Sequence, residues 1–238
     1  RSFGGHTVGG LLLYNQSKSY YPSTYSDIPK GYVGLVGRIT YDWMNRYMAE
    51  FNVGYNGSEN FAPDKRFSAF PAGSVGWLMS EEKFFQPLKS VVSFLKLRAS
   101  FGLVGNDKPD RNAARFMYLA DLDKVIDRIY ASGEAADAWG YLFGITSNTV
   151  TNGAREVSKN NPDVTWEKAF KRNYGIDINF FDDRLSATAE YYREHRWDIL
   201  LRDGTAPGML GFLTPYANLG EVNSWGWELS LKWNDKIG

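Results

Sequence analysis

The stretch NYGIDINFFDDRLSATAEYY, residues 173–192, decides the fold, because apolar and polar side chains alternate along it on both sides of a short turn. Every second side chain is apolar from Tyr174 to Phe180, and again from Leu185 to Tyr191. Successive side chains of a β-strand point to opposite faces, so each half is typical of a strand with one apolar face. Asp182 and the aspartate after it favour a tight turn between them. The stretch therefore predicts a long antiparallel hairpin.

The same period of two recurs along the rest of the chain and extends the hairpin into a sheet. The further strands that it predicts cover residues 6–16, 35–43, 47–56, 68–79, 93–104 and 224–233. In the first of them the register is left open, because neighbouring apolar residues do not alternate cleanly. Counted with the hairpin, whose first strand begins near Thr165, the pattern predicts about eight antiparallel strands.

The links between these strands alternate in length. Tight turns are predicted near residues 45–46, 182–183 and 234–235, an intermediate link with a helical turn at 80–92, and long links at 17–31, 57–67, 105–163 and 203–219. Outer-membrane barrels have short periplasmic turns and longer extracellular loops, and about 9 to 11 tilted residues carry a strand across the bilayer. Several predicted strands are that long. We therefore expect an all-β fold, an antiparallel transmembrane β-barrel wall with its long loops outside the cell.

Composition agrees with a barrel and excludes other classes. Aromatic residues make up 16% of the 238 residues, yet the mean hydropathy is −0.40, as expected where only alternate residues face lipid. The net charge is zero with scattered basic residues, so we expect no nucleic acid partner, and the absence of cysteine excludes thiolate chemistry. Aromatic residues near strand ends could form membrane-interface girdles, or simply an aromatic-rich β core; they are Tyr41, Trp43, Tyr47, Trp77, Trp166, Phe180, Phe181, Tyr191, Trp225 and Trp233.

Several ordered blocks resemble one family. YVGLVGRITYDWMNRYMAEFNVGYNGSENFAP (32–63), FSAFPAGSVGWLMSEEKF (67–84), FLKLRASFGLVGND (94–107), NPDVTWEKAFKRNYGIDINFFDDRLSATAEYYREHRWDILL (161–201) and NLGEVNSWGWELSLKWN (218–234) are similar to the barrel of SusC/RagA-type TonB-dependent outer-membrane transporters. The loops at 17–31, 108–158 and 204–217 carry no such similarity.

The resemblance implies a larger barrel of about 22 strands, of which residues 1–238 would be a central, partial barrel domain. The whole protein would import glycans or peptides across the outer membrane of a Gram-negative bacterium. Its expected partners are outer-membrane lipid, a SusD-like lid lipoprotein, the remainder of the same barrel, and TonB, which would act through a plug domain absent from this chain. We expect both ends of the chain to continue into the rest of that protein.

Two sets of residues are candidates for a function in transport. Charged side chains on the predicted polar faces could line the lumen or anchor the plug, or could simply hydrate the wall; they are Arg38, Asp42, Glu50, Lys96, Arg98, Asp177, Glu190 and Glu228. Aromatic residues of the long loops could stack on a substrate, or pack against neighbouring loops or the lid; they are Tyr20, Tyr21, Tyr25, Trp139, Tyr141, Phe143, Phe212 and Tyr216.

The sequence offers little for catalysis. His6 and His195 are the only histidines, and neither has a companion at metal-ligand spacing. The carboxylate pair Asp121/Asp123 lies in a predicted loop. We therefore predict no enzyme, no metal site and no cofactor. Two rival hypotheses remain open at this point: a soluble or cell-surface β-sandwich that binds carbohydrate, and a β-rich glycosidase.

Overall fold

The computed structural model describes residues 2–19, 30–108, 116–119, 121–124, 141–143, 149–151, 154–205, 209 and 214–235. Nine strands form one antiparallel sheet, and each pairs with the next in the order β1 (Ser2–Phe3), β2 (His6–Ser19), β3 (Lys30–Trp43), β4 (Tyr47–Gly57), β5 (Phe67–Leu78), β6 (Val92–Asn106), β11 (Glu167–Phe180), β12 (Leu185–Arg202) and β13 (Tyr216–Trp233). The all-β prediction is confirmed, and β1 is added to the eight strands expected.

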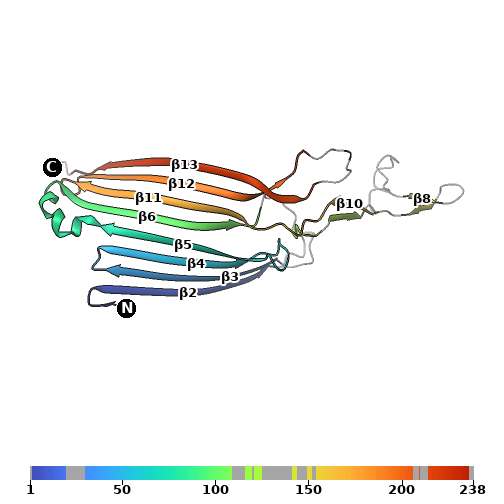
Figure 1. Cartoon of the computed structure of the whole chain (residues 1–238), viewed down its shortest axis with the longest axis horizontal. Coiled ribbons are helices and arrows are strands. Elements are labelled where there is room, and N and C mark those ends of the chain that lie inside the picture. The colour runs from blue at the N-terminus through green and yellow to red at the C-terminus, as the bar shows by residue number, and fades with distance from the viewer. Residues whose placement is uncertain are drawn as a thin grey trace.

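Between β6 and β11 the chain forms four short strands outside the main sheet. These pair as β7 (Asp121–Lys124) with β10 (Ala154–Ser158), and β8 (Tyr141–Phe143) with β9 (Thr149–Thr151). They lie beyond the long-loop end of the sheet, while both chain termini lie at its short-turn end (Figure 1). The predicted alternation of short and long links therefore places each kind of link at its own end of the sheet. None of the helices formed by the described residues is long and apolar enough to cross a membrane.

Two tight turns at the short-turn end hold residues other than glycine in the left-handed region. Between β3 and β4, Met44 and Asn45 have φ of 53° and 56°, and the Arg46 amide donates to the Trp43 carbonyl over 2.9 Å. Positive φ at both central residues matches the twist of an antiparallel hairpin, so this turn joins its strands without splaying them. The turn begins one residue earlier than the sequence predicts.

The turn between β11 and β12 holds three consecutive residues in the left-handed region, Phe181, Asp182 and Asp183. The Asp183 carboxylate accepts hydrogen bonds of 2.8 Å from the Ser93 hydroxyl and from the Asn179 amide. These two hydrogen bonds hold the pKa of Asp183 below its ordinary value, and the bond from Ser93 has the larger effect. This carboxylate therefore joins the start of β6 to the β11–β12 hairpin.

An aromatic belt runs across the short-turn end of the first strands. Consecutive ring centroids lie 5.4 to 6.4 Å apart from His6 through Trp43, Tyr47 and Trp77 to Phe84. Rings of this size at a strand end suit a membrane–water interface. Three of the aromatic residues expected in girdles, Trp43, Tyr47 and Trp77, therefore lie together on one belt.

Glu82 anchors this belt to the link between β5 and β6, which contains the 3₁₀ helices η1 (Met79–Glu81) and η2 (Lys83–Leu88). Its carboxylate accepts hydrogen bonds from the Tyr47 hydroxyl over 2.6 Å and from the Trp77 indole over 3.2 Å, and Arg46 lies 3.8 Å away. The bond from Tyr47 is the main cause of a lowered pKa at Glu82. The predicted helical turn therefore has a definite role at the belt.

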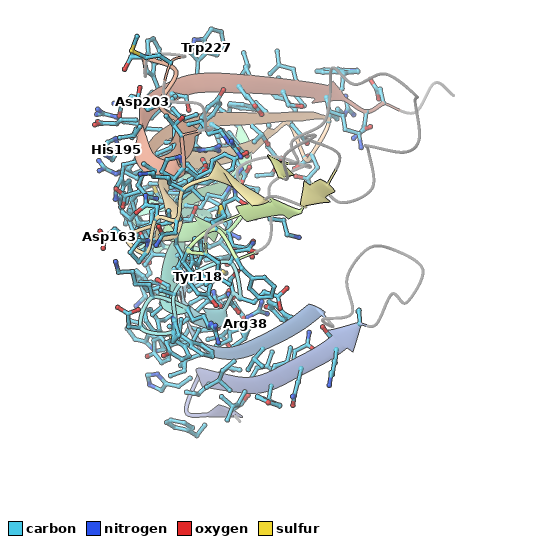
Figure 2. The ribbon with its side chains drawn as sticks, turned by 90° about the vertical axis from the view of Figure 1, so that its right-hand side faces the viewer. Arg38, Tyr118, Asp163, His195, Asp203 and Trp227 are labelled. Atoms are coloured by element: carbon cyan, nitrogen blue, oxygen red, sulfur yellow. The ribbon has the colours of Figure 1, made fainter. Side chains whose placement is uncertain are left out.

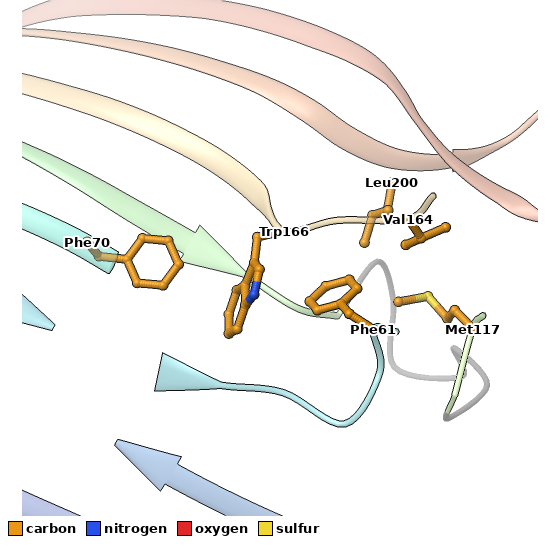
Figure 3. Close-up of a cluster of buried hydrophobic side chains, with 6 residues drawn as sticks. All are labelled: Phe61, Phe70, Met117, Val164, Trp166 and Leu200. Atoms are coloured by element: carbon orange, nitrogen blue, oxygen red, sulfur yellow. The ribbon is translucent and has the colours of Figure 1, made fainter. Parts of the chain in front are cut away.

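Among the described residues, a cluster of buried hydrophobic side chains lies at the long-loop end. The cluster that we call the rim core is shown in Figure 3 and consists of Phe61, Phe70, Met117, Val164, Trp166 and Leu200. The Phe61 and Phe70 rings lie 5.3 and 5.2 Å from the Trp166 ring, and the Trp166 indole donates to the Arg66 carbonyl over 3.2 Å. Trp166 is therefore not part of a lipid-facing girdle, contrary to expectation, because loop residues bury its ring.

Candidate functional site

The register of the sheet gives it two chemically different faces. Directly opposed residues in antiparallel strands share a face. One such row is apolar across eight strands and consists of Val8, Tyr41, Ala49, Val75, Ala99, Tyr174, Tyr191 and Trp227. The next row, one residue nearer the long-loop end on each strand, is mostly polar or small and consists of Gly9, Thr40, Glu50, Ser74, Ser100, Asn173, Tyr192 and Gly226.

The sheet is curved, and its polar face is on the inside of the curve. Figure 2 shows Arg38 within the trough and Trp227 outside it. Trp227 is 72% exposed, and the neighbouring outward side chains Trp225 and Leu229 are also largely exposed. A single sheet that leaves large apolar side chains uncovered on one face has the pattern of a barrel wall rather than that of a globular core.

All eight charged residues predicted for the lumen lie on this inner face. Thr7, Asp42, Met48, Gly76, Arg98, Gly175, Glu190 and Glu228 form one row across the sheet. Arg38 and Glu50 lie on neighbouring inner rows in β3 and β4, and Lys96 is paired directly with Asp177 in the register of β6 and β11. The structure therefore brings the predicted set together on one surface.

The strongest polar cluster of this face is centred on Arg98. Its Nε lies 3.1 Å from Asp177 Oδ2, and its Nη2 contacts Glu190 Oε1. Both acids have a further donor, since the Thr188 hydroxyl bonds Asp177 over 3.1 Å and the Asn173 amide bonds Glu190 over 3.0 Å. Charge-assisted hydrogen bonds of this kind are the strong ones, so the cluster connects β6, β11 and β12 across their inner surface.

A glycine makes the reach of Arg98 possible. Arg98 is directly opposite Gly175 on β11, and a Cβ at Gly175 would lie 2.6 Å from the Arg98 Cζ. Since glycine has no Cβ, the guanidinium lies across β11 and meets Glu190 on the strand beyond it. In the local sequence Tyr174-Gly175-Ile176, the two apolar side chains thus lie on the outer face, and the glycine leaves room for the Arg98 guanidinium on the inner face.

Two smaller clusters flank the first. On β3 and β4, the Arg38 Nε donates to Asn52 over 2.9 Å, and the Asn52 amide donates to Glu50 over 2.6 Å. Towards the long loops, Glu194 lies 3.2 Å from the Lys171 ammonium and 2.7 Å from Arg196. Sequence reasoning missed Lys171, Glu194 and Arg196, although continuing the alternation along β11 and β12 would have identified them.

A hollow of about 480 Å³ lies on the inner face between these clusters. Its polar lining includes Thr40, Glu50, Lys96, Arg98 and Asn173. Its acids lie on β3 and β4 and its cations on β6, so the surface can hold water or a polar segment of protein. Within the described residues no group of three or more histidine, aspartate or glutamate side chains could hold a metal ion.

The loop aromatics predicted to bind substrate fall mostly outside the described residues. Tyr20, Tyr21, Tyr25, Trp139 and Phe212 lie there, and only the backbone strand β8 is described for Tyr141 and Phe143. Tyr216 is the first residue of β13; its ring packs against the rim core, with the Arg202 Cζ 4.6 Å from the ring centroid.

The histidines occupy structural positions at the strands. His6 Nδ1 lies 2.8 Å from the Tyr41 hydroxyl within the aromatic belt. His195 Nδ1 lies 3.0 Å from Asn223 Oδ1, and its ring stacks on Trp197 at 5.1 Å. Both are therefore engaged with neighbours on the outer face, away from the inner clusters.

Comparison with known proteins identifies the fold family. Residues 3–238 match the family described as TonB dependent receptor-like, beta-barrel. TonB-dependent receptor P39 of Formosa agariphila is 32% identical over 83% of this chain and 16% of its own length. SusC of Bacteroides thetaiotaomicron is 30% identical over 84% of this chain and 18% of its own length. The chain thus spans about a sixth of these curated relatives.

Solved structures agree on the fold. The RagAB peptide transporter matches 97% of this chain with 26% of its own, at a TM-score of 0.73 and 22% identity. The same importer in its closed-closed state matches the whole chain at a TM-score of 0.76 and 20% identity. These likenesses, with the similarity to SusC, confirm the predicted resemblance to SusC/RagA barrels. The chain belongs to the TonB-dependent receptor-like β-barrel family, and its two-faced sheet is a stretch of such a barrel.

Proposed function

We propose that this chain is part of the wall of a TonB-dependent importer in the outer membrane of a Gram-negative bacterium. The observation that carries the proposal is the register, which keeps a row of apolar side chains on the outside of the curve across eight strands and places the charged clusters on the inside. Lipid would cover the outer face, and water or a plug domain would meet the inner face. The chain itself would catalyse no reaction.

The sheet edges support a larger barrel. Among the described strands, β1 and β13 are the outermost, and each pairs with one neighbour. An open strand edge in hydrocarbon would leave backbone hydrogen-bonding groups unsatisfied, at several kcal/mol for each group. Further strands of the same barrel would satisfy both edges. About 22 strands would enclose a lumen wide enough for a plug.

We infer the substrate class and the partners from the named relatives. The structural neighbour is a peptide importer, while another relative is named SusC, so a peptide or a glycan is the expected cargo. A SusD-like lipoprotein would cover the long loops, and TonB would act through the plug. The loop aromatics other than Tyr216, whose ring packs against the rim core, would contact the cargo or the lid.

The β-sandwich rival lacks support in the part of the chain that the structure describes. A sandwich needs a second sheet packed on the apolar face. Outward residues such as Trp227 and Leu231 are instead 72% and 65% exposed. The glycosidase rival has equally little support, because the inner carboxylates of Asp177 and Glu190 are both bonded to Arg98.

Single cysteines test the wall directly, since this chain has none of its own. Thr188→Cys and Ala189→Cys are adjacent substitutions of small side chains on the inner and outer faces of β12. In the complete protein in lipid nanodiscs, a water-soluble maleimide should label Cys at position 188 much faster than at position 189. A nitroxide attached at each site should show the opposite order of collision with dissolved oxygen, which concentrates in hydrocarbon. Equal labelling at both positions would disprove the proposed wall.

Import is tested in cells. Uptake of labelled peptide and oligosaccharide pools should require both the complete protein and TonB, and one pool should be preferred. Uptake that persists without TonB would contradict the energised mechanism. It would leave the membrane placement of the strands to be judged by the cysteine experiment.

A further inference from the structure

Two arginines stand directly opposite each other on the apolar outer face. Arg172 of β11 is paired with Arg193 of β12, in a row with Phe101 of β6 and Trp225 of β13. The Cβ atoms of directly opposed residues lie about 4.5–5.5 Å apart, and like charges in such a pair are destabilising. The position therefore calls for a negative partner.

The described residues supply no such partner. Neither arginine forms an ion pair there, and the Arg172 Cζ lies 4.9 Å from the Phe170 ring centroid. Glu221, an acid of the outer face further along, lies 3.7 Å from His195. The adjacent inner-face residues differ, since Lys171 and Arg196 both contact Glu194. The arginine pair thus sits amid aromatic neighbours, and no acid among the described residues compensates its charge.

The position of the arginine pair along the membrane normal indicates which group could neutralise its charge. Arg193 lies eight residues beyond Leu185, the first residue of β12 at the short-turn end. At about 3.3 Å per residue and a tilt of about 35–45°, this places the pair roughly 20 Å above that end. The apolar band of such a barrel is about 25 Å tall. The long arginine side chains can therefore extend to the headgroup level on the long-loop side.

We propose that Arg172 and Arg193 together bind a phosphate group of an anionic lipid in the outer leaflet. Guanidinium groups bind phosphate oxygens with paired, charge-assisted hydrogen bonds, and two converging guanidinium groups can hold one phosphate from both sides. The rings of Phe170, Tyr174 and Trp225 surround the pair with apolar surface for the acyl chains. The inference rests on the proposed membrane placement and adds a specific lipid site to it.

Lipid retention by the complete purified protein tests the site. The protein is placed in nanodiscs of phosphatidylcholine with a minor share of phosphatidic acid, extracted into mild detergent, and its bound lipid is counted by native mass spectrometry. R172Q/R193Q should retain phosphatidic acid about 25-fold more weakly, from about fivefold for each basic residue at an anionic surface. K96Q/K171Q removes two charges from the inner face and should retain the lipid as the unmodified protein does.

Each remaining outcome decides the question. Equal retention by R172Q/R193Q and the unmodified protein, or equal loss in K96Q/K171Q, overturns the site. Inorganic phosphate should not displace the lipid; displacement would show a general anion site and refute a lipid site. If the double variant does not fold, R193Q alone should show the fivefold loss, and unchanged retention refutes the proposal. The cysteine experiment judges membrane placement separately, so failure here leaves the wall intact.

Discussion

The wall and the rim core of this chain are stabilised in different ways. In the rim core, Phe61 and Val164 are almost fully buried by other side chains, as in a soluble protein. Along the wall, Trp225 and Trp227 are 68% and 72% exposed, and the strands are held by their hydrogen-bond ladders and by charged clusters on the inner face. The wall therefore depends on its surroundings to cover it, whereas the rim core is complete in itself.

This difference suggests a division of labour. The rim core connects the loop after β4 to the segment before β11 and to the end of β12, and the Lys65 ammonium adds a 2.7 Å contact with Asp163. The Ser58 hydroxyl also bonds Asp107 over 2.7 Å. The roots of the long loops are thereby fixed at one level, and the more distal loop residues can vary in sequence without disturbing the wall.

Truncating the central ring of the rim core should produce the largest effect. Trp166→Ala removes a buried ring that contacts Phe61 and Phe70, and truncations of this type cost about 3–5 kcal/mol because a cavity remains. The loss is measured by equilibrium unfolding of the complete protein in nanodiscs. Trp227→Ala is the matched control and should cost much less, because lipid can fill the space. Equal losses would refute the distinction between the two regions.

Glycine substitutions sharpen the same comparison. A Cβ at Gly105 would overlap the Phe70 ring, which is confined in the rim core, so Gly105→Ala should cost about 1–3 kcal/mol as overpacking does. A Cβ at Gly175 would instead meet the Arg98 side chain on the open inner face, where it has room to move aside. Gly175→Ala should therefore cost less than Gly105→Ala in the same unfolding experiment. The reverse order would show that the wall is the more tightly packed region.

The sequence predicted the wall far better than the rim core, for a physical reason. Alternation is a local property, so the hairpin around Asp182 and the two faces of β11 could be derived from neighbouring residues. The register of β2 could not be derived in this way, because Leu11, Leu12 and Leu13 are consecutive apolar residues. Only the pairing with β3 decides that Leu12 lies on the outer face.

Contacts between distant segments escaped prediction. Trp166 bonds the carbonyl of a residue 100 positions earlier, and no periodic pattern marks the loops that enclose it. The charges of the inner face were predicted from alternation, but the partners of Arg98 were not, since Asp177 and Glu190 lie 79 and 92 positions away. The partner of each charged side chain depends on which residues the pairing of the strands places opposite each other, and alternation within one strand does not determine this pairing.

Removing the central charge of the wall should have an intermediate effect. Arg98→Met leaves Asp177 and Glu190 without their shared cation, and Glu228 lies directly opposite Glu190. We expect a loss of about 1–2 kcal/mol in unfolding free energy, since these groups are about a quarter to a third exposed and screened by water. Adding Glu190→Gln should recover part of that loss in a double-mutant cycle. Strict additivity of the two substitutions would show that the pair is not coupled.

Acid should loosen the short-turn end before the rim core, and this is the smallest expected effect. Because Ser93 and Asn179 lower the pKa of Asp183, its contribution to stability is complete above the unfolded value of 3.8 and is lost as the pH falls through the lower folded pKa. Amide hydrogen exchange at Phe181, which donates to the Val91 carbonyl, should accelerate in that range. Asp183→Asn retains an oxygen acceptor but no titration, so its exchange should lack this acid-dependent step. The side chains of the rim core around Trp166 are apolar, so its fluorescence should stay constant over the same range; a simultaneous change at both ends would mean that they open as one unit.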